Sequence, residues 1–360
     1  MRAAVLYEYG APLVIAELDL DPPQAGEILV RMAASGVCHS DLHSVQGIHP
    51  GPMPAVIGHE GAGVVEQIGP GVTSVRPGDH VILTWLPYCG ECQRCIGGRA
   101  NLCERLEWSN AGFMQDGTVR LHRDGQPIHH YTTSSFAEAA VVPEQTAIKV
   151  DRDLPLTELA LMGCAVMTGV GAVLNTARVR AGDTVAVVGC GGVGLNIVQG
   201  AAIASARRIV AIDLEPSKLE LARQLGATET VLASAGDTID AVVAGGGLVD
   251  FAFEAIGRPS TIELATKLVR AGGETILVGM APPEARVAFD PLDLTTGEKA
   301  IRGSWYGSCR PPIDFPILLD LYRSGRLRLD LLVTPCALDD VNDALAAMET
   351  GKVARSVIVF

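Results

Sequence analysis

The chain has 360 residues, more than one hydrophobic core usually holds, so we expect two domains. It is 48% apolar and only 4% aromatic, with 40 glycines, which is typical of an α/β enzyme and excludes a disordered or fibrous chain. The net charge of −13, without any basic block, argues against a nucleic-acid partner.

The N-terminal residues alternate between apolar and polar, with interruptions at Gly10 and Pro12. They lack the apolar core and small-residue cleavage site of a signal peptide, and no segment reaches the roughly 18 apolar residues of a membrane span. Nine cysteines, an odd number, then favour free thiols and metal ligands over disulfides. We therefore expect a cytoplasmic protein without a membrane partner.

Residues 1–166 are rich in short apolar runs separated by Pro-Gly and Gly-Pro-Gly turns, for example at 69–72 and 76–79. This pattern predicts a mostly antiparallel, partly barrel-like domain. The segment 306–360 contains two helical patterns and a terminal strand, and we expect it to return to this first domain. Residues 156–175 predict one continuous helix at the domain boundary.

Four cysteines follow the spacing C-x2-C-x2-C-x7-C, and this spacing predicts a structural zinc site. Four thiolates close a tetrahedral shell around Zn²⁺ and leave no position open for chemistry. An iron–sulfur loop would place its fourth cysteine after three residues and before a proline, whereas here the gap is seven and Glu104 follows. A disulfide pair is the other alternative, but nothing upstream suggests secretion. The ligands would be Cys89, Cys92, Cys95 and Cys103.

Between 167 and 305, apolar strands alternate with helical patterns, which indicates a parallel sheet covered on both faces. The run 189–194 fits G-x-G-x-x-G; it follows a strand, opens a helix and precedes an acidic residue that closes the next strand. Such a turn brings backbone close to a pyrophosphate at a helix N-terminus. A tight turn without a ligand is the alternative. The predicted cofactor residues are Gly189, Gly191, Gly192, Val193, Gly194 and Asp213.

Asp213 favours NAD over NADP. Its carboxylate can accept hydrogen bonds from both hydroxyls of an adenosine ribose, and it would repel a 2′-phosphate.

Cys38, His59 and Cys164 suggest a second zinc site. A lone cysteine in apolar surroundings is more often a small core residue, so none of the three is informative by itself. Together they offer two thiolates and one imidazole, and a catalytic zinc uses three protein ligands and one open position. We therefore expect two zinc ions per chain.

These motifs resemble those of the zinc-dependent medium-chain alcohol dehydrogenases. The resemblance includes GVCHSDLH at 36–43, GHEGAG at 58–63, the four-cysteine lobe, GCAVMTG at 163–169, the glycine loop and GKVARSVIVF at 351–360. It implies an α/β chain with a β-rich GroES-like catalytic domain and a doubly wound Rossmann domain. The segment at 110–140 resembles the class III, glutathione-dependent formaldehyde dehydrogenases, and 302–327 is similar to the mycothiol-dependent enzymes.

The resemblance also implies roles for single residues. Ser40 matches the hydroxyl that bonds the substrate alcohol, and His43 matches the far end of a proton relay, for which an imidazole titrating near neutral pH is suited. Glu60 and Asp41 match acids beside the catalytic zinc, with Asp41 orienting His59. Further cofactor contacts are expected at His39, Thr168, Lys218 and Arg355. Trp85 and Met280 match bulky residues of the substrate pocket.

The expected function is hydride transfer between a primary or aromatic alcohol, or the aldehyde, and NAD. A homodimer paired through 277–289 is our first choice, with a tetramer as the alternative. The second hypothesis is a formaldehyde dehydrogenase acting on an S-hydroxymethyl adduct of mycothiol or glutathione. Class III enzymes carry an arginine four residues after the last lobe cysteine, whereas this chain has Glu107, with Arg105 out of register. A remote third hypothesis is a non-catalytic NAD-binding structural or sensor protein, which would be expected to lack a zinc ligand.

Overall fold

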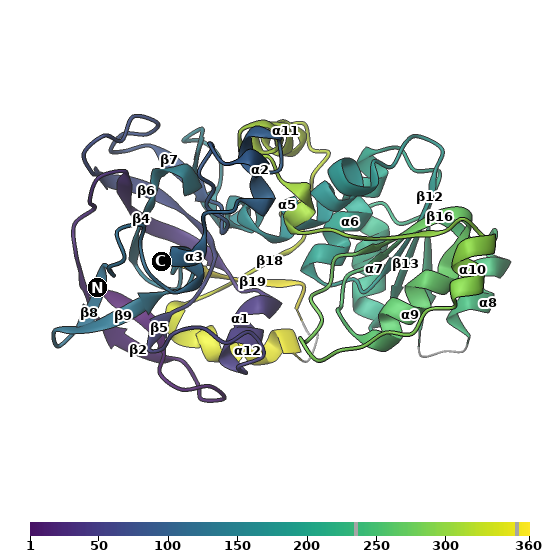
Figure 1. Cartoon of the computed structure of the whole chain (residues 1–360), viewed down its shortest axis with the longest axis horizontal. Coiled ribbons are helices and arrows are strands. Elements are labelled where there is room, and N and C mark those ends of the chain that lie inside the picture. The colour runs from purple at the N-terminus through teal and green to yellow at the C-terminus, as the bar shows by residue number, and fades with distance from the viewer. Residues whose placement is uncertain (234–236, 350–352) are drawn as a thin grey trace. The chain divides into compact units, whose positions relative to one another are not determined.

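A computed structural model describes residues 1–233, 237–349 and 353–360, and the chain divides into two compact units (Figure 1). Unit 1 comprises Met1–Cys164, Arg310–Pro316 and Leu332–Phe360, and unit 2 comprises Ala165–Cys309 and Ile317–Leu331. Part of the expected motif at 351–360, Gly351 and Lys352, lies outside the described residues.

This division differs in detail from the predicted boundaries, which assigned all of 306–360 to the first domain. Residues 317–331 group with unit 2 because their backbone and side chains bond to a helix there. The N–H of Arg328 donates to Gln199 Oε1 at 2.7 Å, and Arg326 donates to the carbonyl of Ile203 at 3.0 Å.

The larger sheet of unit 1 has seven strands in the order β11-β7-β6-β4-β19-β18, with β10 also paired to β4. Its strands are β4 (Glu27–Gly36), β6 (Glu60–Ile68), β7 (His80–Leu83), β10 (Ala139–Pro143), β11 (Ala147–Val150), β18 (Val333–Cys336) and β19 (Arg355–Val359). The pairing of β4 with β6 shifts register twice, and such irregularities bend and twist strands. Alternate residues of β4, Ile28, Val30 and Met32, point into one buried cluster.

The second sheet of unit 1 has six strands in the order β2-β1-β5-β9-β8-β3. They are β1 (Arg2–Leu6), β2 (Val14–Glu17), β3 (Asp19–Leu20), β5 (Ala55–Val56), β8 (Leu121–Arg123) and β9 (Gln126–His130). The helices are α1 (His39–Val45), α2 (Gln93–Ile96), η1 (Ala100–Leu102), α3 (Glu107–Asn110), η2 (Glu144–Thr146), α4 (Leu156–Leu159), η3 (Ala160–Gly163), η6 (Leu338–Asp340) and α12 (Val341–Glu349). Helix α11 (Pro311–Arg323) begins in unit 1 and ends in unit 2.

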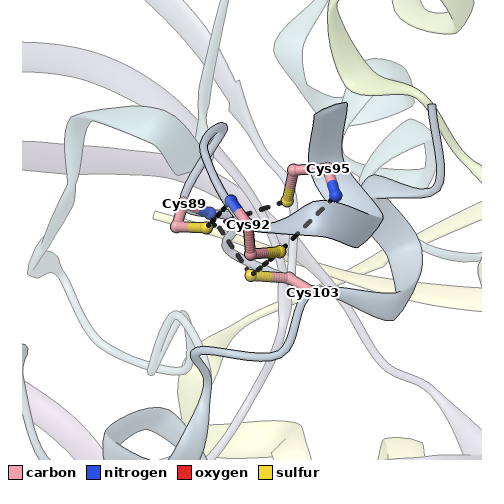
Figure 2. A group of neighbouring side chains, drawn as sticks. All are labelled: Cys89, Cys92, Cys95 and Cys103. Carbon is pink, nitrogen blue, oxygen red and sulfur yellow. Dashed lines mark hydrogen bonds between the residues drawn. The ribbon is translucent and has the colours of Figure 1, made fainter. Parts of the chain in front are cut away.

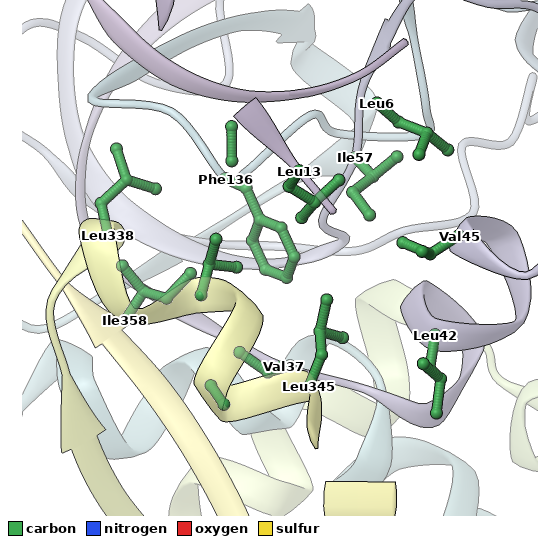
Figure 3. Close-up of a cluster of buried hydrophobic side chains, with 13 residues drawn as sticks. Leu6, Leu13, Val37, Leu42, Val45, Ile57, Phe136, Leu338, Leu345 and Ile358 are labelled. Carbon is green, nitrogen blue, oxygen red and sulfur yellow. The ribbon is translucent and has the colours of Figure 1, made fainter. Parts of the chain in front are cut away.

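The C-terminal elements complete a core of unit 1 around Phe136 (Figure 3). Leu345 from α12 and Ile358 from β19 pack there with Val37 and Leu42, which flank the start of α1. Strand β19 also pairs antiparallel with the end of β4. This packing holds the start of α1 firmly, and α1 carries part of the site described below.

Unit 2 is a six-stranded parallel sheet in the order β14-β13-β12-β15-β16-β17. Its strands are β12 (Thr184–Val188), β13 (Arg208–Asp213), β14 (Glu229–Leu232), β15 (Val249–Glu254), β16 (Val269–Leu277) and β17 (Ala300–Gly303). The helices are α5 (Ala165–Gly171), η4 (Ala172–Ala177), α6 (Gly192–Ile203), α7 (Pro216–Gln224), α8 (Thr238–Ala244), α9 (Pro259–Leu268), α10 (Pro291–Thr296) and η5 (Tyr306–Ser308).

The strand order of unit 2 reverses between β12 and β15, and ligands of open α/β sheets bind at such a point, outside the carboxyl ends of the strands. The predicted fold class, a β-rich catalytic domain and a doubly wound domain, is confirmed. Among the described residues, no single helix has the length and apolar character to cross a membrane. Two helical segments joined at a bend, Leu156–Gly163 and Ala165–Ala177, together have the length and apolar composition of a membrane span. Most of their residues, however, are buried in the protein.

Candidate active site

Four ligand groups from distant parts of the sequence converge in unit 1. One ligand atom each from Cys38, His59, Glu60 and Cys164 lies within 4.8 Å of the other three, and all four residues are buried. Cys38 caps α1, His59 and Glu60 stand at the start of β6, and Cys164 follows η3. The structure thus brings together the three predicted catalytic zinc ligands, with Glu60 beside them.

The position of Cys164 depends on a break in a helix. The continuous helix predicted over 156–175 is wrong, because Cys164 has φ −139° and ψ −77° and separates η3 from α5. The apolar periodicity on both sides concealed this break. At this break the thiol of Cys164 lies among the other ligand groups.

Asp41 organises two of these ligands. One carboxylate oxygen accepts the backbone N–H of Cys38 at 2.8 Å, and the other lies 2.8 Å from Nδ1 of His59. Asp41 is fully buried, so water does not compete for these bonds. A carboxylate that holds one nitrogen of a histidine fixes the ring orientation and leaves the other nitrogen for a metal. This is the role expected for Asp41.

Glu60 forms a buried ion pair with Arg355, the first residue of β19. Its oxygen Oε2 contacts the guanidinium, while Oε1 is buried without a hydrogen-bond partner in the described part of the chain. Burial raises the pKa of Glu60 to about 7, against the opposing effect of Arg355. An unpartnered buried carboxylate oxygen next to thiols and an imidazole is itself a potential metal ligand.

The protonation of the thiols also suits a metal. The hydrogen bond with Cys164 lowers the pKa of Cys38 well below its usual value, against the effect of burial. The same bond and burial raise the pKa of Cys164. Two sulfurs beside an imidazole with a fixed ring form a donor set that Zn²⁺ prefers. Cys38, His59 and Cys164 therefore fit three positions of a zinc ion, and Glu60 or another ligand would take the fourth.

The four lobe cysteines converge on one point as well (Figure 2). The sulfurs of Cys89 and Cys95 are 3.9 Å apart and those of Cys92 and Cys103 are 4.0 Å apart. A tetrahedral ZnS₄ site with Zn–S bonds of about 2.3 Å requires sulfurs about 3.8 Å apart. Backbone N–H groups of Glu104 and Cys95 donate to Cys92 and lower its pKa to about 6. The lobe fits a closed structural zinc site.

Ser40 and His43 lie on α1 beside the first metal group. The hydroxyl of Ser40 is 3.2 Å from the sulfur of Cys38, and His43 follows three residues later on the same helical face. The ring of His43 lies edge-on to those of His39 and His49, with centroids 4.9 Å and 5.3 Å apart.

The expectation that His43 titrates near neutral pH is wrong for this structure. Burial lowers its pKa to about 4, with smaller contributions from His39 and His49. His39 lies four residues earlier on the same helix, so its proximity follows from the spacing, whereas that of His49, beyond the end of α1, does not.

Two aromatic rings face His59, one of which the sequence did not single out. The rings of Trp85 and Tyr131 lie 6.5 Å and 6.4 Å from that of His59. The hydroxyl of Tyr131 bonds to Ser44, and burial raises the pKa of Tyr131. No local pattern signals this position of Tyr131, because the residue is distant from His59 in the sequence. The other predicted pocket residue, Met280, belongs to unit 2 and is 39% exposed.

The predicted dinucleotide turn of unit 2 requires glycine at positions 189 and 194. Gly189 follows β12 with φ +95°, and a Cβ on Gly194 would lie 1.7 Å from the carbonyl oxygen of Gly189. Gly191 caps the 12-residue helix α6, with Gly192 and Val193 in its first turn. The first N–H groups of a helix have no partner within the helix, and a glycine-rich turn lets a pyrophosphate approach them.

Asp213 ends β13 next to this turn. Its two oxygens accept the backbone N–H groups of Cys190 at 2.7 Å and of Glu215 at 3.0 Å. The carboxylate thus supports the turn and retains lone pairs for a ribose. Lys218 lies half-buried on α7 and Thr168 half-buried on α5. Cofactor contacts of these two residues, of exposed His39 and of buried Arg355 stay predictions.

Comparisons with known proteins agree with this description. A family model described as alcohol dehydrogenase GroES-like domain matches residues 24–152, and one described as zinc-binding dehydrogenase matches 192–324. An Escherichia coli S-(hydroxymethyl)glutathione dehydrogenase is 41% identical over 99% of both chains. Benzyl alcohol dehydrogenase from Acinetobacter calcoaceticus is 35% identical, with a TM-score of 0.95 over 100% of this chain and 99% of that one. A zinc-binding dehydrogenase fold from Sinorhizobium meliloti, solved with NADP bound, is 27% identical, with a TM-score of 0.83 over 100% and 99%.

The doubly wound α/β unit and the two matching family models together place the chain among the oxidoreductases. The chain belongs to the zinc-binding alcohol dehydrogenase family. The predicted family, its class III resemblance and the assignment as an oxidoreductase are therefore confirmed.

Proposed function

We propose that this protein is an NAD-dependent alcohol dehydrogenase with two zinc ions per chain, acting on primary or benzyl-type alcohols or the corresponding aldehydes. The observation that carries the proposal is the convergence of Cys38, His59 and Cys164, with Asp41 fixing the ring of His59. These three residues would hold the catalytic zinc, and the cysteine lobe would hold the structural one.

A zinc ion at this site would supply Lewis acidity toward the substrate oxygen, and NAD would supply the hydride acceptor. The chain's own residues position the groups and move the proton. Asp41 keeps the His59 ring in one orientation. Ser40 places its hydroxyl beside Cys38, where it can accept the proton of an alcohol and pass it on. The glycine turn and α6 would receive the pyrophosphate.

Replacing Ser40 with alanine should lower kcat by about 10²–10⁴-fold, the usual contribution of a group in contact with the reacting proton. Replacing His43 with glutamine should cost less than about tenfold, because water can substitute at that end. Because the pKa of His43 is about 4, its ring is neutral above that pH, and H43Q should leave the shape of the pH–rate profile between about 6 and 9 unchanged. Steady-state kinetics across this range test both expectations; a nearly fully active S40A variant would refute the role of Ser40.

Cofactor choice should depend on the charge of Asp213. A solved relative of this fold has NADP bound, so the fold itself accepts a 2′-phosphate. We expect the unmodified protein to prefer NAD, and Asp213→Ala to weaken NAD binding and admit NADP. Asp213→Asn keeps an acceptor for the turn and removes the charge, so it should admit NADP with a smaller loss for NAD. Equal use of both cofactors by the unmodified protein would contradict the assignment.

A formaldehyde dehydrogenase acting on a thiol adduct is the second candidate, favoured by the Escherichia coli relative. Two features of the lobe oppose glutathione. Glu107 begins α3 and would repel glutathione's carboxylates, and the guanidinium of Arg105 already pairs with Glu91. The rings of Trp85 and Tyr131 beside His59 suit flat or unbranched alcohols, in keeping with the benzyl alcohol relative.

The test compares kcat/KM for benzyl alcohol and a simple primary alcohol with that for formaldehyde plus glutathione or mycothiol, followed by NADH absorbance. We expect direct oxidation of the alcohols and little gain from either thiol. A large advantage for an adduct, with negligible activity on free alcohols, would favour the second candidate.

We also propose a cytoplasmic homodimer. The segment 277–289 begins at the last residue of β16, and its Met280 and Phe289 are 39% and 41% exposed, as expected for residues covered by a second copy. Light scattering of the purified protein distinguishes a monomer, a dimer and a tetramer.

A further inference from the structure

Glu254 is a buried acid next to the dinucleotide turn that has no place in the function described so far. It ends β15, is fully buried, and pairs in register with Val188, the residue before Gly189. It therefore lies at the carboxyl edge of the parallel sheet, on the strand next to the one that carries the turn.

The side chain of Glu254 holds a second turn, residues 255–258. Its oxygen Oε1 accepts the backbone N–H groups of Ile256 at 3.0 Å and Gly257 at 2.8 Å, and the hydroxyl of Thr261 at 2.7 Å. Burial raises the pKa of Glu254, while these hydrogen bonds act in the opposite direction. Three donors on one oxygen fix the backbone of this turn.

The turn is also confined on its other side. Gly257 has φ +88°, and a Cβ there would lie 2.4 Å from the carbonyl oxygen of Met280. A Cβ on Gly279 would lie 2.2 Å from the nitrogen of Gly257. The backbone at 255–258 is therefore confined between Glu254 and residues 279–280, which follow β16.

This position places Ile256 against the glycine turn. A Cβ on Gly189 would lie 2.4 Å from Cγ1 of Ile256, yet the side chain of Ile256 is 40% exposed. An apolar side chain that contacts the first glycine and still faces outward can form one binding surface with that turn.

We propose that Glu254 is a positioning residue for the dinucleotide, which acts by holding the amides of Ile256 and Gly257 so that Ile256 and the Gly189 turn form one surface. The proposal rests on the proposed binding of NAD. Glu254 does not itself touch the cofactor; Ile256 does.

The test measures NADH binding by fluorescence titration, together with thermal unfolding of the protein without cofactor. Glu254→Asp shortens the side chain so that it no longer reaches both amides, and we expect NADH affinity to fall about tenfold. Glu254→Gln keeps an oxygen that can accept the same hydrogen bonds, so its affinity should stay within about threefold. For E254D, KM for NAD should rise while kcat at saturating NAD changes less than about twofold.

Asp250 provides a matched control on the same strand. Its carboxylate accepts the backbone N–H of Thr184 at 2.7 Å and pairs with Arg270, far from the glycine turn along β15. Asp250→Ala should lower the unfolding temperature without changing NADH affinity. If D250A weakened NADH binding as much as E254D, the effect would be one of general stability and the proposal would be wrong.

A double-mutant cycle tests the action through Ile256. Ile256→Ala should weaken NADH binding, and the E254D/I256A protein should bind no more weakly than I256A within about twofold, because both changes remove one surface. Additive losses would show that the two residues act independently and would overturn the proposed action through Ile256.

The proposal and the proposed function can fail separately. If the unmodified protein binds NADH and E254D binds it equally well, this proposal is refuted. If the unmodified protein binds no NADH, the proposed function is refuted.

Discussion

Replacing Cys164 with serine should abolish turnover while the fold survives. Cys164 contributes one of three ligands to the buried group, and a hydroxyl is a much poorer ligand for zinc than a thiolate. A Lewis acid supplies several kcal/mol of barrier lowering, and each 1.4 kcal/mol is about a factor of ten, so kcat should fall by about 10³-fold or more. Kinetics with benzyl alcohol and NAD, combined with zinc analysis, measure the effect.

Cys336→Ser is the control for this variant. Cys336 is also in unit 1, but it lies on β18 outside both clusters of ligand groups, and burial raises the pKa of its thiol to about 11. This variant should keep its zinc and its activity. NADH binding by the C164S protein should persist, because the glycine turn is unaffected. Substantial alcohol oxidation by a C164S protein that has lost one zinc would remove the basis for the catalytic site.

Much of this site could be predicted because its motifs carry local constraints. Two glycines of the dinucleotide turn, Gly189 and Gly194, are dictated by steric contacts, as the distance from a Cβ on Gly194 to Gly189 shows. The lobe cysteines lie close together in sequence, so their spacing alone limits the geometry of their sulfurs. Asp41 is three residues from Cys38, and the start of a helix allows it to cap that residue.

What could not be predicted depends on residues that are distant in sequence. The pairing of Glu60 with Arg355 arises where β19 returns to β4, and no local pattern encodes it. The lowered pKa of His43 results mainly from burial, with smaller effects of His39 and of His49, and a loop rather than the helix brings His49 close. The break at Cys164 was hidden because apolar periodicity continues through it. Tertiary packing decided each of these features.

The largest effect on stability is expected from Cys89→Ser, in the lobe. With one thiolate missing, the remaining sulfurs no longer close a tetrahedral shell, and the free energy that zinc binding contributes to folding is largely lost. Loss of a structural metal is among the most destabilising single changes, about 4 kcal/mol or more, which corresponds to a fall in Tm of about 5 °C or more for a protein of this size. Calorimetry measures the fall in Tm, and elemental analysis should find about one zinc fewer per chain.

The two cysteine variants should have opposite effects on stability and on turnover. C89S should lose stability and retain its catalytic zinc, so that kcat measured well below its Tm stays within about threefold of the unmodified value. C164S should retain stability and lose turnover. Only chemically separate sites give this pattern, because a closed ZnS₄ shell has no position for a substrate, whereas two thiolates and one imidazole, from Cys38, Cys164 and His59, do not by themselves close a shell. If C89S kept its Tm, or lost turnover at a temperature where it is folded, the lobe would have a role other than holding the fold.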